Sequence, residues 1–172
     1  LNASARPIQR TRSRFVRVGQ CDGSSADMRT GLRISIPWRL NRLASMRCYW
    51  LGPDEWLIVT PDERRAEIER ELKRALASLR VAITDVSGGQ TVLQLHGRNV
   101  RDVLAKGCPI DLHPRAFAIG QCAQSHLAKA PILIGQIENQ PYFELVFRRS
   151  FADYLWSWLE VAAAEYGLEV AA

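Results

Sequence analysis

The sequence predicts an α+β fold made of two sandwich halves of the split β-α-β, or ferredoxin-like, type. Short β-prone runs alternate with amphipathic helical stretches along the 172 residues. Residues 14–87 follow the order strand, helix, strand, strand, helix, strand, and after residues 87–89 the order begins again. We therefore expect a flexible tail over 1–13, a first half over 14–87 and a second half over 88–172, with the two halves able to pack as one domain.

The first half contains several extended segments before its long helix. RFVRV alternates Arg with apolar side chains, which is the period of a half-buried strand. The predicted segments are a strand over 14–18, a short helix over 24–31 closed by Gly31, an extended run over 32–42 broken by Pro37, and strands over 45–51 and 55–60.

The last two of these strands meet at Gly52-Pro53-Asp54, and this turn holds the first candidate for chemistry. Asp54 and Glu55 lie between two Trp-containing runs, where a pair of carboxylates suggests acid/base catalysis. However, Pro presets the φ angle required at the first central position of a turn, and Asp is tolerated at the second. The sequence therefore favours a hairpin corner for Asp54 and a strand start for Glu55.

A long helix is predicted directly after the second of these strands. Thr60 and Glu63 have the spacing of a capping box, with Pro61 at the first helical position. Glu69 and Lys73 form an i,i+4 pair on the exposed face. The inward face is formed by Ile68, Leu72, Ala75, Leu76 and Leu79, and a strand over 81–86 follows.

The second half ends on a strongly apolar helix. In YFELVF, Phe143, Leu145 and Phe147 share one face, opposite Tyr142, Glu144 and Val146. The predicted elements are a strand over 91–97, a helix over 98–107 with Val100, Val103 and Leu104 inward, a loop over 108–120, strands over 122–128, 131–137 and 142–147, and a short strand over 168–172. The last helix is expected to be capped by Ser150 with Asp153, to bury Phe151, Tyr154, Leu155, Trp158, Leu159, Ala162 and Tyr166, and to stop at Gly167.

Motifs for nucleotide binding and nucleophilic catalysis are weak. The sequence has neither GxxxxGK[ST] nor GxGxxG, and Gly88-Gly89 precedes a strand, which favours a hinge or bulge over a phosphate cradle. Asp85, Ser87 and His96 are the types that a catalytic triad needs, but Ser87 does not lie in a strand-to-helix elbow. An incidental serine is the stronger interpretation.

The histidines and cysteines also lack the spacing of a known site. His96, His113 and His126 are far apart, and convergence of Cys108, His113 and Cys122 on a metal is a minor hypothesis. Cys108 before Pro109 is an equally speculative nucleophile. No disulfide framework is indicated by Cys21, Cys48, Cys108 and Cys122, so we expect a cytosolic chain with buried or incidental thiols.

Charge is distributed unevenly along the chain. Residues 1–50 hold ten Arg and two Asp, a net charge of +8, and the remaining thirteen basic and sixteen acidic residues give −3. This basic third suggests nucleic acid, an acidic protein partner, or simply solvated arginines. No apolar run approaches the roughly 20 residues of a membrane helix. Residues 1–15 lack the apolar core of a secretory signal; their composition is seen in transit peptides, but a truncated start or flexible tail is the preferred interpretation.

Tryptophans give a further hint. Trp50 and Trp56 flank the predicted hairpin. Trp156 and Trp158 lie two positions apart on the last helix, so their side chains point about 200° apart. Trp158 belongs to the buried stripe, and Trp156 either caps the edge of the core or enters an interface.

Four segments together carry a family resemblance: LGPDEWLIV, TDVSGGQTVLQLHG, VRDVLAKGCPIDLHPRAF and SFADYLWSWLE. In this order, between Tyr49 and Glu160, they resemble the gamma-subunit family of heterotetrameric sarcosine oxidases. Residues 1–44 match that family only loosely. The family is related to the aminomethyltransferase, or glycine-cleavage T-protein, superfamily, which implies a fold similar to the aminomethyltransferase folate-binding domain.

The resemblance implies a non-catalytic structural subunit. The tetramer oxidatively demethylates sarcosine to glycine, passes the one-carbon unit to tetrahydrofolate and reduces oxygen to peroxide. The resemblance implies that FAD, FMN, NAD, zinc and the folate site belong to the alpha, beta and delta subunits. It also implies that the complex is located in the cytoplasm. It supplies no catalytic, cofactor-binding or metal-binding residue for this chain, and related tetramers act on other N-methylated amino acids.

Two other functions stay open from the sequence. A free-standing folate-binding or aminomethyl-transfer protein would need a carboxylate in a pterin-sized pocket with aromatic walls. An RNA-binding module would use the basic N-terminal third, where only Phe15 and Trp38 supply aromatic surface.

Overall fold

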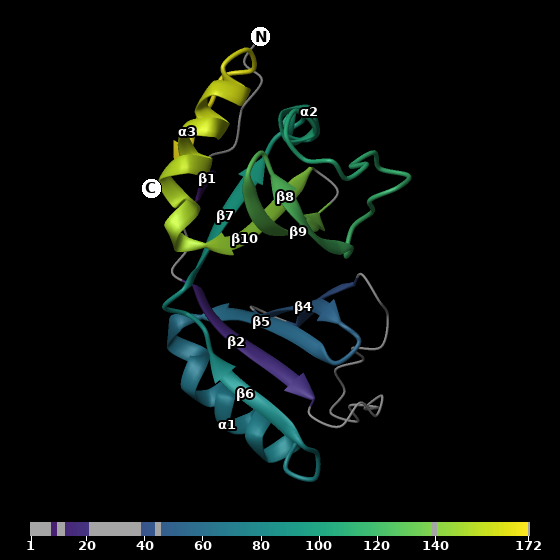
Figure 1. Cartoon of the computed structure of the whole chain (residues 1–172), viewed down its shortest axis with the longest axis vertical. Coiled ribbons are helices and arrows are strands. Elements are labelled where there is room, and N and C mark those ends of the chain that lie inside the picture. The colour runs from purple at the N-terminus through teal and green to yellow at the C-terminus, as the bar shows by residue number, and fades with distance from the viewer. Residues whose placement is uncertain (1–7, 10–12, 21–38, 44–45, 139–140, 172) are drawn as a thin grey trace. The chain divides into compact units, whose positions relative to one another are not determined.

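The computed structural model describes residues 8–9, 13–20, 39–43, 46–138 and 141–171. The chain divides into two compact units, each with its own β-sheet (Figure 1). The N-terminal unit spans Arg12–Gly88, and the C-terminal unit spans Gly89–Ala172 together with the segment Leu1–Thr11. Within the described residues, no helix is long and apolar enough to cross a membrane.

The N-terminal unit contains a five-stranded antiparallel sheet in the order β3-β4-β5-β2-β6. Its strands are β2 (Ser13–Gln20), β3 (Leu40–Leu43), β4 (Met46–Gly52), β5 (Glu55–Pro61) and β6 (Val81–Asp85). Because β2 is antiparallel to both β5 and β6, these two run in the same direction with β2 between them, and the helix Arg65–Ala75 connects them as the split β-α-β motif requires. The helix predicted over 24–31 lies outside the described residues.

Helix α1 (Arg65–Ala75) covers one face of this sheet (Figure 1). The predicted capping box is wrong, since no side chain caps the helix and Thr60 belongs to β5. A 3-10 turn over Asp62–Arg64 comes between β5 and α1, so helical structure begins one residue later than the sequence suggests. Ala75 is exposed rather than inward. The core beneath the helix consists of Val16, Val18, Cys48, Trp56, Ile58, Ile68 and Leu76.

The C-terminal unit contains a six-stranded sheet in the order β11-β1-β7-β10-β9-β8. Its strands are β1 (Ile8–Gln9), β7 (Gln90–His96), β8 (Cys122–Leu127), β9 (Ala130–Glu138), β10 (Tyr142–Arg148) and β11 (Val170–Ala171). Strands β10 and β11 run in the same direction with β7 and β1 between them, and the helix Ala152–Ala163 connects them, so this unit repeats the split arrangement. Strand β1 pairs with β11 and β7, and Ser13 already belongs to β2, although the sequence predicts a tail over residues 1–13.

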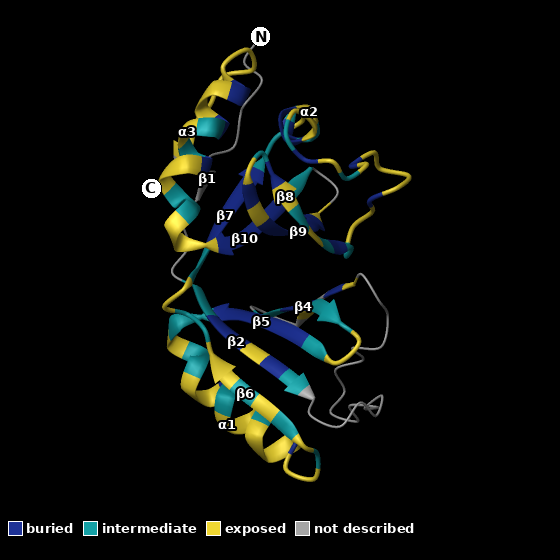
Figure 2. Ribbon diagram, in the orientation of Figure 1, coloured by how far each residue is buried: buried dark blue, intermediate teal, exposed yellow. Residues whose placement is uncertain are grey.

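Helices α2 (Val100–Ala105) and α3 (Ala152–Ala163) contribute to the core of the C-terminal unit. As predicted, Phe143, Leu145 and Phe147 of β10 face this core. The expected cap by Ser150 is absent, because a 3-10 turn over residues 149–151 leads into α3 without a side-chain cap. Gly167, at φ +80°, follows the last turn after α3. Figure 2 shows the buried residues of this unit concentrated in the strands, and the buried residues of α3 are Leu155, Leu159, Ala162 and Ala163.

Candidate functional site

The corner that holds Asp54 and Glu55 is a hairpin turn between β4 and β5. Asp54 is exposed at the turn. Glu55 begins β5, and its carboxylate is paired with the guanidinium of Arg17 on β2. The two carboxylates therefore do different things: one is solvated, and the other joins neighbouring strands. Trp50 and Trp56 face each other across this hairpin.

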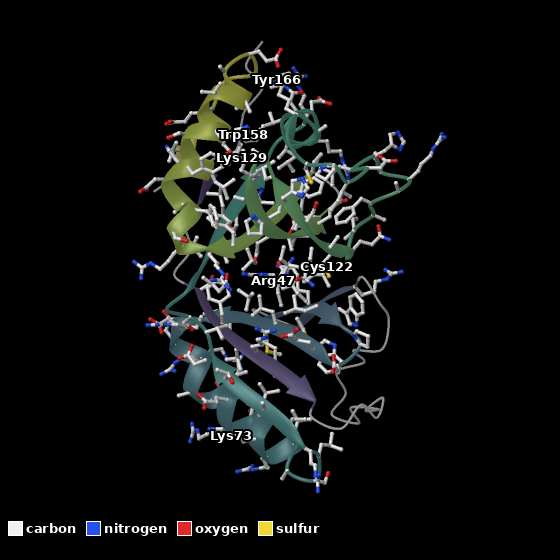
Figure 3. The ribbon with its side chains drawn as sticks, in the orientation of Figure 1. Arg47, Lys73, Cys122, Lys129, Trp158 and Tyr166 are labelled. Atoms are coloured by element: carbon white, nitrogen blue, oxygen red, sulfur yellow. The ribbon has the colours of Figure 1, made fainter. Side chains whose placement is uncertain are left out.

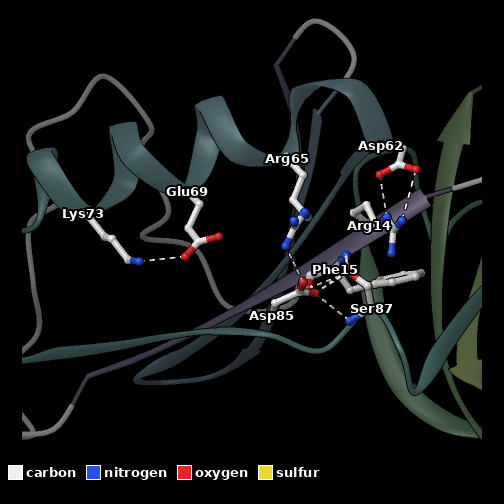
Figure 4. Close-up of polar contacts among 8 residues, drawn as sticks. All are labelled: Arg14, Phe15, Asp62, Arg65, Glu69, Lys73, Asp85 and Ser87. Carbon is white, nitrogen blue, oxygen red and sulfur yellow. Dashed lines mark hydrogen bonds and ion pairs between the residues drawn. The ribbon is translucent and has the colours of Figure 1, made fainter.

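Asp85 and Ser87 join the end of β6 to the neighbouring strand β2 (Figure 4). The hydroxyl of Ser87 accepts a hydrogen bond from the backbone N–H of Phe15 at 2.9 Å and donates to Asp85 Oδ1. Asp85 Oδ1 also accepts from the Ser87 N–H at 2.9 Å, and Oδ2 accepts from Arg65 at 2.6 Å. These hydrogen bonds from Ser87, together with the Arg65 charge, lower the pKa of Asp85. The ionised Asp85 carboxylate thus holds Ser87 against the backbone of Phe15, and we call this link between β6 and β2 the strand clamp.

His96, the third member of the hypothetical triad with Asp85 and Ser87, belongs to the C-terminal unit. Its ring stacks on Tyr142 from the paired strand, with 3.9 Å between ring centroids and an interplanar angle of 25°. Tyr142 and His96 are directly opposite in the register of β10 and β7. Cross-strand stacking of this kind stabilises the pairing of β7 with β10, two inner strands of the sheet. Ser87 is thus part of one local network and His96 of another.

A second clamp ties β2 to the beginning of the α1 segment (Figure 4). Arg14 donates from Nε to Asp62 Oδ1 at 2.6 Å and from Nη2 to Asp62 Oδ2 at 3.1 Å. This fork geometry is the strongest that Arg and a carboxylate make. It raises the pKa of Arg14, mainly through the hydrogen bond with Asp62. Two arginines of the basic N-terminal third, Arg14 and Arg17, thus form ion pairs within the N-terminal unit.

The hypothetical metal ligands of the C-terminal unit do not form a cluster. Cys108 is buried with its Sγ 4.0 Å from Ser125 Oγ, whereas His113 is exposed and its Nδ1 accepts from the Arg115 N–H at 3.2 Å. Cys122 is buried in β8. Among the residues that the structure describes, no three His, Cys, Asp or Glu side chains gather as metal ligands would.

Arg101 anchors the loop between α2 and β8, a role that the sequence does not reveal. Its guanidinium donates to the carbonyl of Leu112 and, at 2.8 Å, to Gln136 Oε1, and it lies 5.0 Å from the centre of the Phe143 ring. Partial burial lowers the pKa of Arg101. Since the spacing from 101 to 136 follows no motif, only the fold brings these residues together. The contacts are those of a loop anchor.

The two tryptophans of α3 are both partly buried against the core. Trp158 covers Gly107, where an added Cβ would lie 2.5 Å from Trp158 Cζ2, and Figure 3 shows Trp158 projecting from the helix. Trp156 donates from its indole N–H to Glu160 Oε1 at 2.9 Å. Trp156 therefore caps the edge of the core, as one of its two interpretations holds, and orients a carboxylate on the outer side of α3.

Comparisons with known proteins place this geometry in a family. The model of the family "Sarcosine oxidase, gamma subunit family" matches residues 21–165. A curated sarcosine oxidase subunit gamma from Corynebacterium sp. (strain P-1) is 38% identical over 120 residues, which are 70% of this chain. The alignment covers 58% of that relative, so this chain matches little more than half of its length.

Solved structures agree with the sequence comparison. A chain of the heterotetrameric sarcosine oxidase from Corynebacterium sp. U-96 superposes with a TM-score of 0.80 at 27% identity, covering 95% of this chain and 87% of that one. Aminomethyltransferase T of the glycine cleavage system from Bartonella henselae gives a TM-score of 0.66 at 14% identity, covering 90% of this chain and 45% of that one, which shows the fold alone. The predicted α+β architecture similar to aminomethyltransferase is confirmed. The chain belongs to the sarcosine oxidase gamma subunit family.

Proposed function

We propose that this chain is a non-catalytic structural subunit of a heterotetrameric sarcosine oxidase. The observation that carries the proposal is the match of 95% of the chain, at a TM-score of 0.80, to a chain of such a tetramer. Fold alone does not imply function, so the proposal also rests on the match of the gamma subunit family model to residues 21–165. In this role the chain contributes shape and contact area, and its partners contribute the reaction.

The chemistry of the polar side chains supports a structural role. Glu55, Asp85 and Asp62 are engaged by Arg17, Arg65 and Arg14, and each of these pairs joins two elements of the N-terminal unit. A general base or nucleophile needs a free lone pair that faces a substrate. These three carboxylates are held in ion pairs that join elements of the fold, which supports a structural role for them.

Partners and cofactors follow from the proposed assembly. Its companions would be alpha, beta and delta subunits, and FAD, FMN, NAD, zinc and tetrahydrofolate would reside on those chains. Together they would demethylate sarcosine, or another N-methylated amino acid, oxidatively in the cytoplasm. The one-carbon unit would pass to tetrahydrofolate, and oxygen would be reduced to peroxide.

The test is affinity purification of the tagged chain from its native cell. We expect three further chains to co-elute with flavin absorbance, and the eluate to form peroxide when sarcosine is added. The isolated chain should form none. Turnover by the isolated chain, or elution with no flavoprotein, contradicts the proposal.

An alternative function is folate binding or aminomethyl transfer by the chain itself, which the fold shared with aminomethyltransferase T favours. The shared part is 45% of that enzyme chain. Titration of tetrahydrofolate into the purified chain, followed by calorimetry and Trp fluorescence, separates the two functions. Saturable binding supports the alternative. RNA binding ranks last, and it predicts an affinity that falls steeply with added salt.

A further inference from the structure

Exposed apolar side chains are concentrated at the end of the chain. Among the described residues, six large hydrophobic side chains are exposed, and five of them lie between residues 154 and 170: Tyr154, Val161, Tyr166, Leu168 and Val170. Val161 is the most open of the set, with 78% of its surface accessible. A cluster of this kind on an otherwise ordinary surface marks an interaction site more often than scattered single residues do.

Small and apolar side chains form an outer stripe on one exposed face of α3 and its C-cap residue Ala164, bordered by the Tyr154 hydroxyl, which accepts from the Lys129 N–H at 3.3 Å. Tyr154, Ser157, Val161 and Ala164 are exposed and spaced i, i+3, i+7 and i+10, so they share one helical face. The inner side holds Leu155, Leu159, Ala162 and Ala163, which are buried in the core. Helix α3 therefore leaves two large apolar side chains, Tyr154 and Val161, exposed on the side away from its buried residues. Small residues at 157 and 164 leave room for side chains of a partner beside Val161.

Two carboxylates, those of Asp153 and Glu160, border the outer stripe without an ion pair to a cation of the described residues. Residues 150–172 contain four carboxylates, Asp153, Glu160, Glu165 and Glu169, and no Lys or Arg, although the whole chain has a net charge of +5. Glu165 is paired with Lys106. Asp153 and Glu160 are exposed beside the stripe, and no ion pair joins them to a cation of the described residues. Trp156 holds the Glu160 carboxylate in place through its indole N–H.

We propose that the outer face of α3, defined by Tyr154, Ser157, Val161 and Ala164 with Asp153 and Glu160 at its edge, docks a partner subunit through an apolar surface flanked by Lys or Arg. Charge complementarity selects this occupant, because two solvated carboxylates at an apolar patch attract a basic rim and lower the rate of wrong encounters. The identity of the partner as a chain of the oxidase rests on the proposed function.

The test compares variants of the tagged chain co-expressed with the other three subunits. Val161→Arg places a cation in the centre of the stripe, and Ala75→Arg places one at an exposed position near the end of α1 as the matched control. We expect Val161→Arg to lower the partner recovered per tagged chain by roughly tenfold, as loss of a central contact does, and Ala75→Arg to leave it unchanged. Circular dichroism should show both variants folded, because both side chains are exposed.

A charge reversal tests the contribution of the two carboxylates, Asp153 and Glu160, at the edge of the docking face. Asp153→Lys with Glu160→Lys should weaken recovery and remove its sensitivity to salt, whereas Glu63→Lys with Glu71→Lys, the same charge change on the α1 segment, should do neither. Wild-type recovery with Val161→Arg and with the α3 charge reversal overturns the docking face and leaves the proposed function standing. If the wild-type chain itself recovers no flavoprotein, or recovers only a second copy of itself, the proposed function fails and this inference with it.

Discussion

Helices α1 and α3 hold corresponding places in the two split motifs, but their outer faces differ. On α1, five of the seven exposed residues carry charge: Glu67, Arg70, Glu71, Lys73 and Arg74. On α3 the five exposed residues are Asp153, Tyr154, Ser157, Glu160 and Val161. Two ion pairs, Arg64 with Glu67 and Lys73 with Glu69, satisfy part of the charge on α1. The exposed face of α1 is therefore a charged, solvated surface. The exposed face of α3 instead leaves apolar area available for contact with another protein.

The largest expected effect concerns the inner side of α3. Leu159 is 1% exposed, so Leu159→Ala should cost about 3 kcal/mol of unfolding free energy through lost transfer energy and the cavity left behind. Val161 lies two residues further along the helix and is exposed, so Val161→Ala should cost less than about 0.5 kcal/mol of unfolding free energy. Urea unfolding of the two variants measures the contrast. Equal losses would mean that Val161 is part of the core.

Steric contact between α2 and α3 gives the next effect. Gly107→Ala would place a Cβ 2.5 Å from Trp158 Cζ2 and 3.1 Å from the Ala128 backbone nitrogen. Because the indole must move out of its place in the core, we expect a loss of about 2 kcal/mol. The double variant Gly107→Ala with Trp158→Leu should lose less than the sum of the two single variants. Thermal unfolding of the four proteins tests this coupling; additive losses contradict it.

The strand clamp in the N-terminal unit makes a smaller, pH-dependent contribution. The pKa of Asp85 is lowered in the folded state, so its stabilisation is present above the pKa of an unfolded Asp and is lost as the pH falls through the folded value. Asp85→Ala should therefore cost about 1 kcal/mol or less at pH 7, since the group is partly exposed and screened. The difference from wild type should shrink below about pH 4. Denaturant titrations at pH 7 and pH 3 check this, and a constant difference contradicts it.

The smallest effect is at the surface of α1. Lys73 Nζ lies 2.7 Å from Glu69 Oε1, the i,i+4 pair that the sequence predicts. Lys73→Ala should cost about 0.3 kcal/mol, and 1 M NaCl should remove the effect. Thermal unfolding at low and high salt measures it. A salt-independent loss would show that the lysine contributes by packing.

Sequence patterns predict the strands and helices well where periodicity decides. The strand over 55–60 and the buried trio Val100, Val103 and Leu104 follow from apolar spacing alone, and the structure has both. Helix starts are less predictable. Thr60 and Ser150 have good capping chemistry, yet the strand continues past Thr60, and Ser150 lies in a 3-10 turn, because tertiary pairing decides where each segment turns.

Long-range polar contacts cannot be read from sequence. Arg101 meets Leu112 and Gln136 only because β9 and the preceding loop pass beside α2. In the same way, Ser87 contacts Phe15 across 72 positions because β6 pairs with β2. The sequence did place Trp156 at the edge of the buried stripe, but its bond to Glu160 required the side-chain geometry.

Hydrogen exchange of the chain alone and within its purified complex tests the contrast between the two helices most directly. We expect the amides of α3 and the residues after it to exchange more slowly in the complex, and those of α1 to keep the same rate in both states. Unchanged exchange in α3, or protection that appears on α1 instead, would contradict a docking role for the outer face of α3.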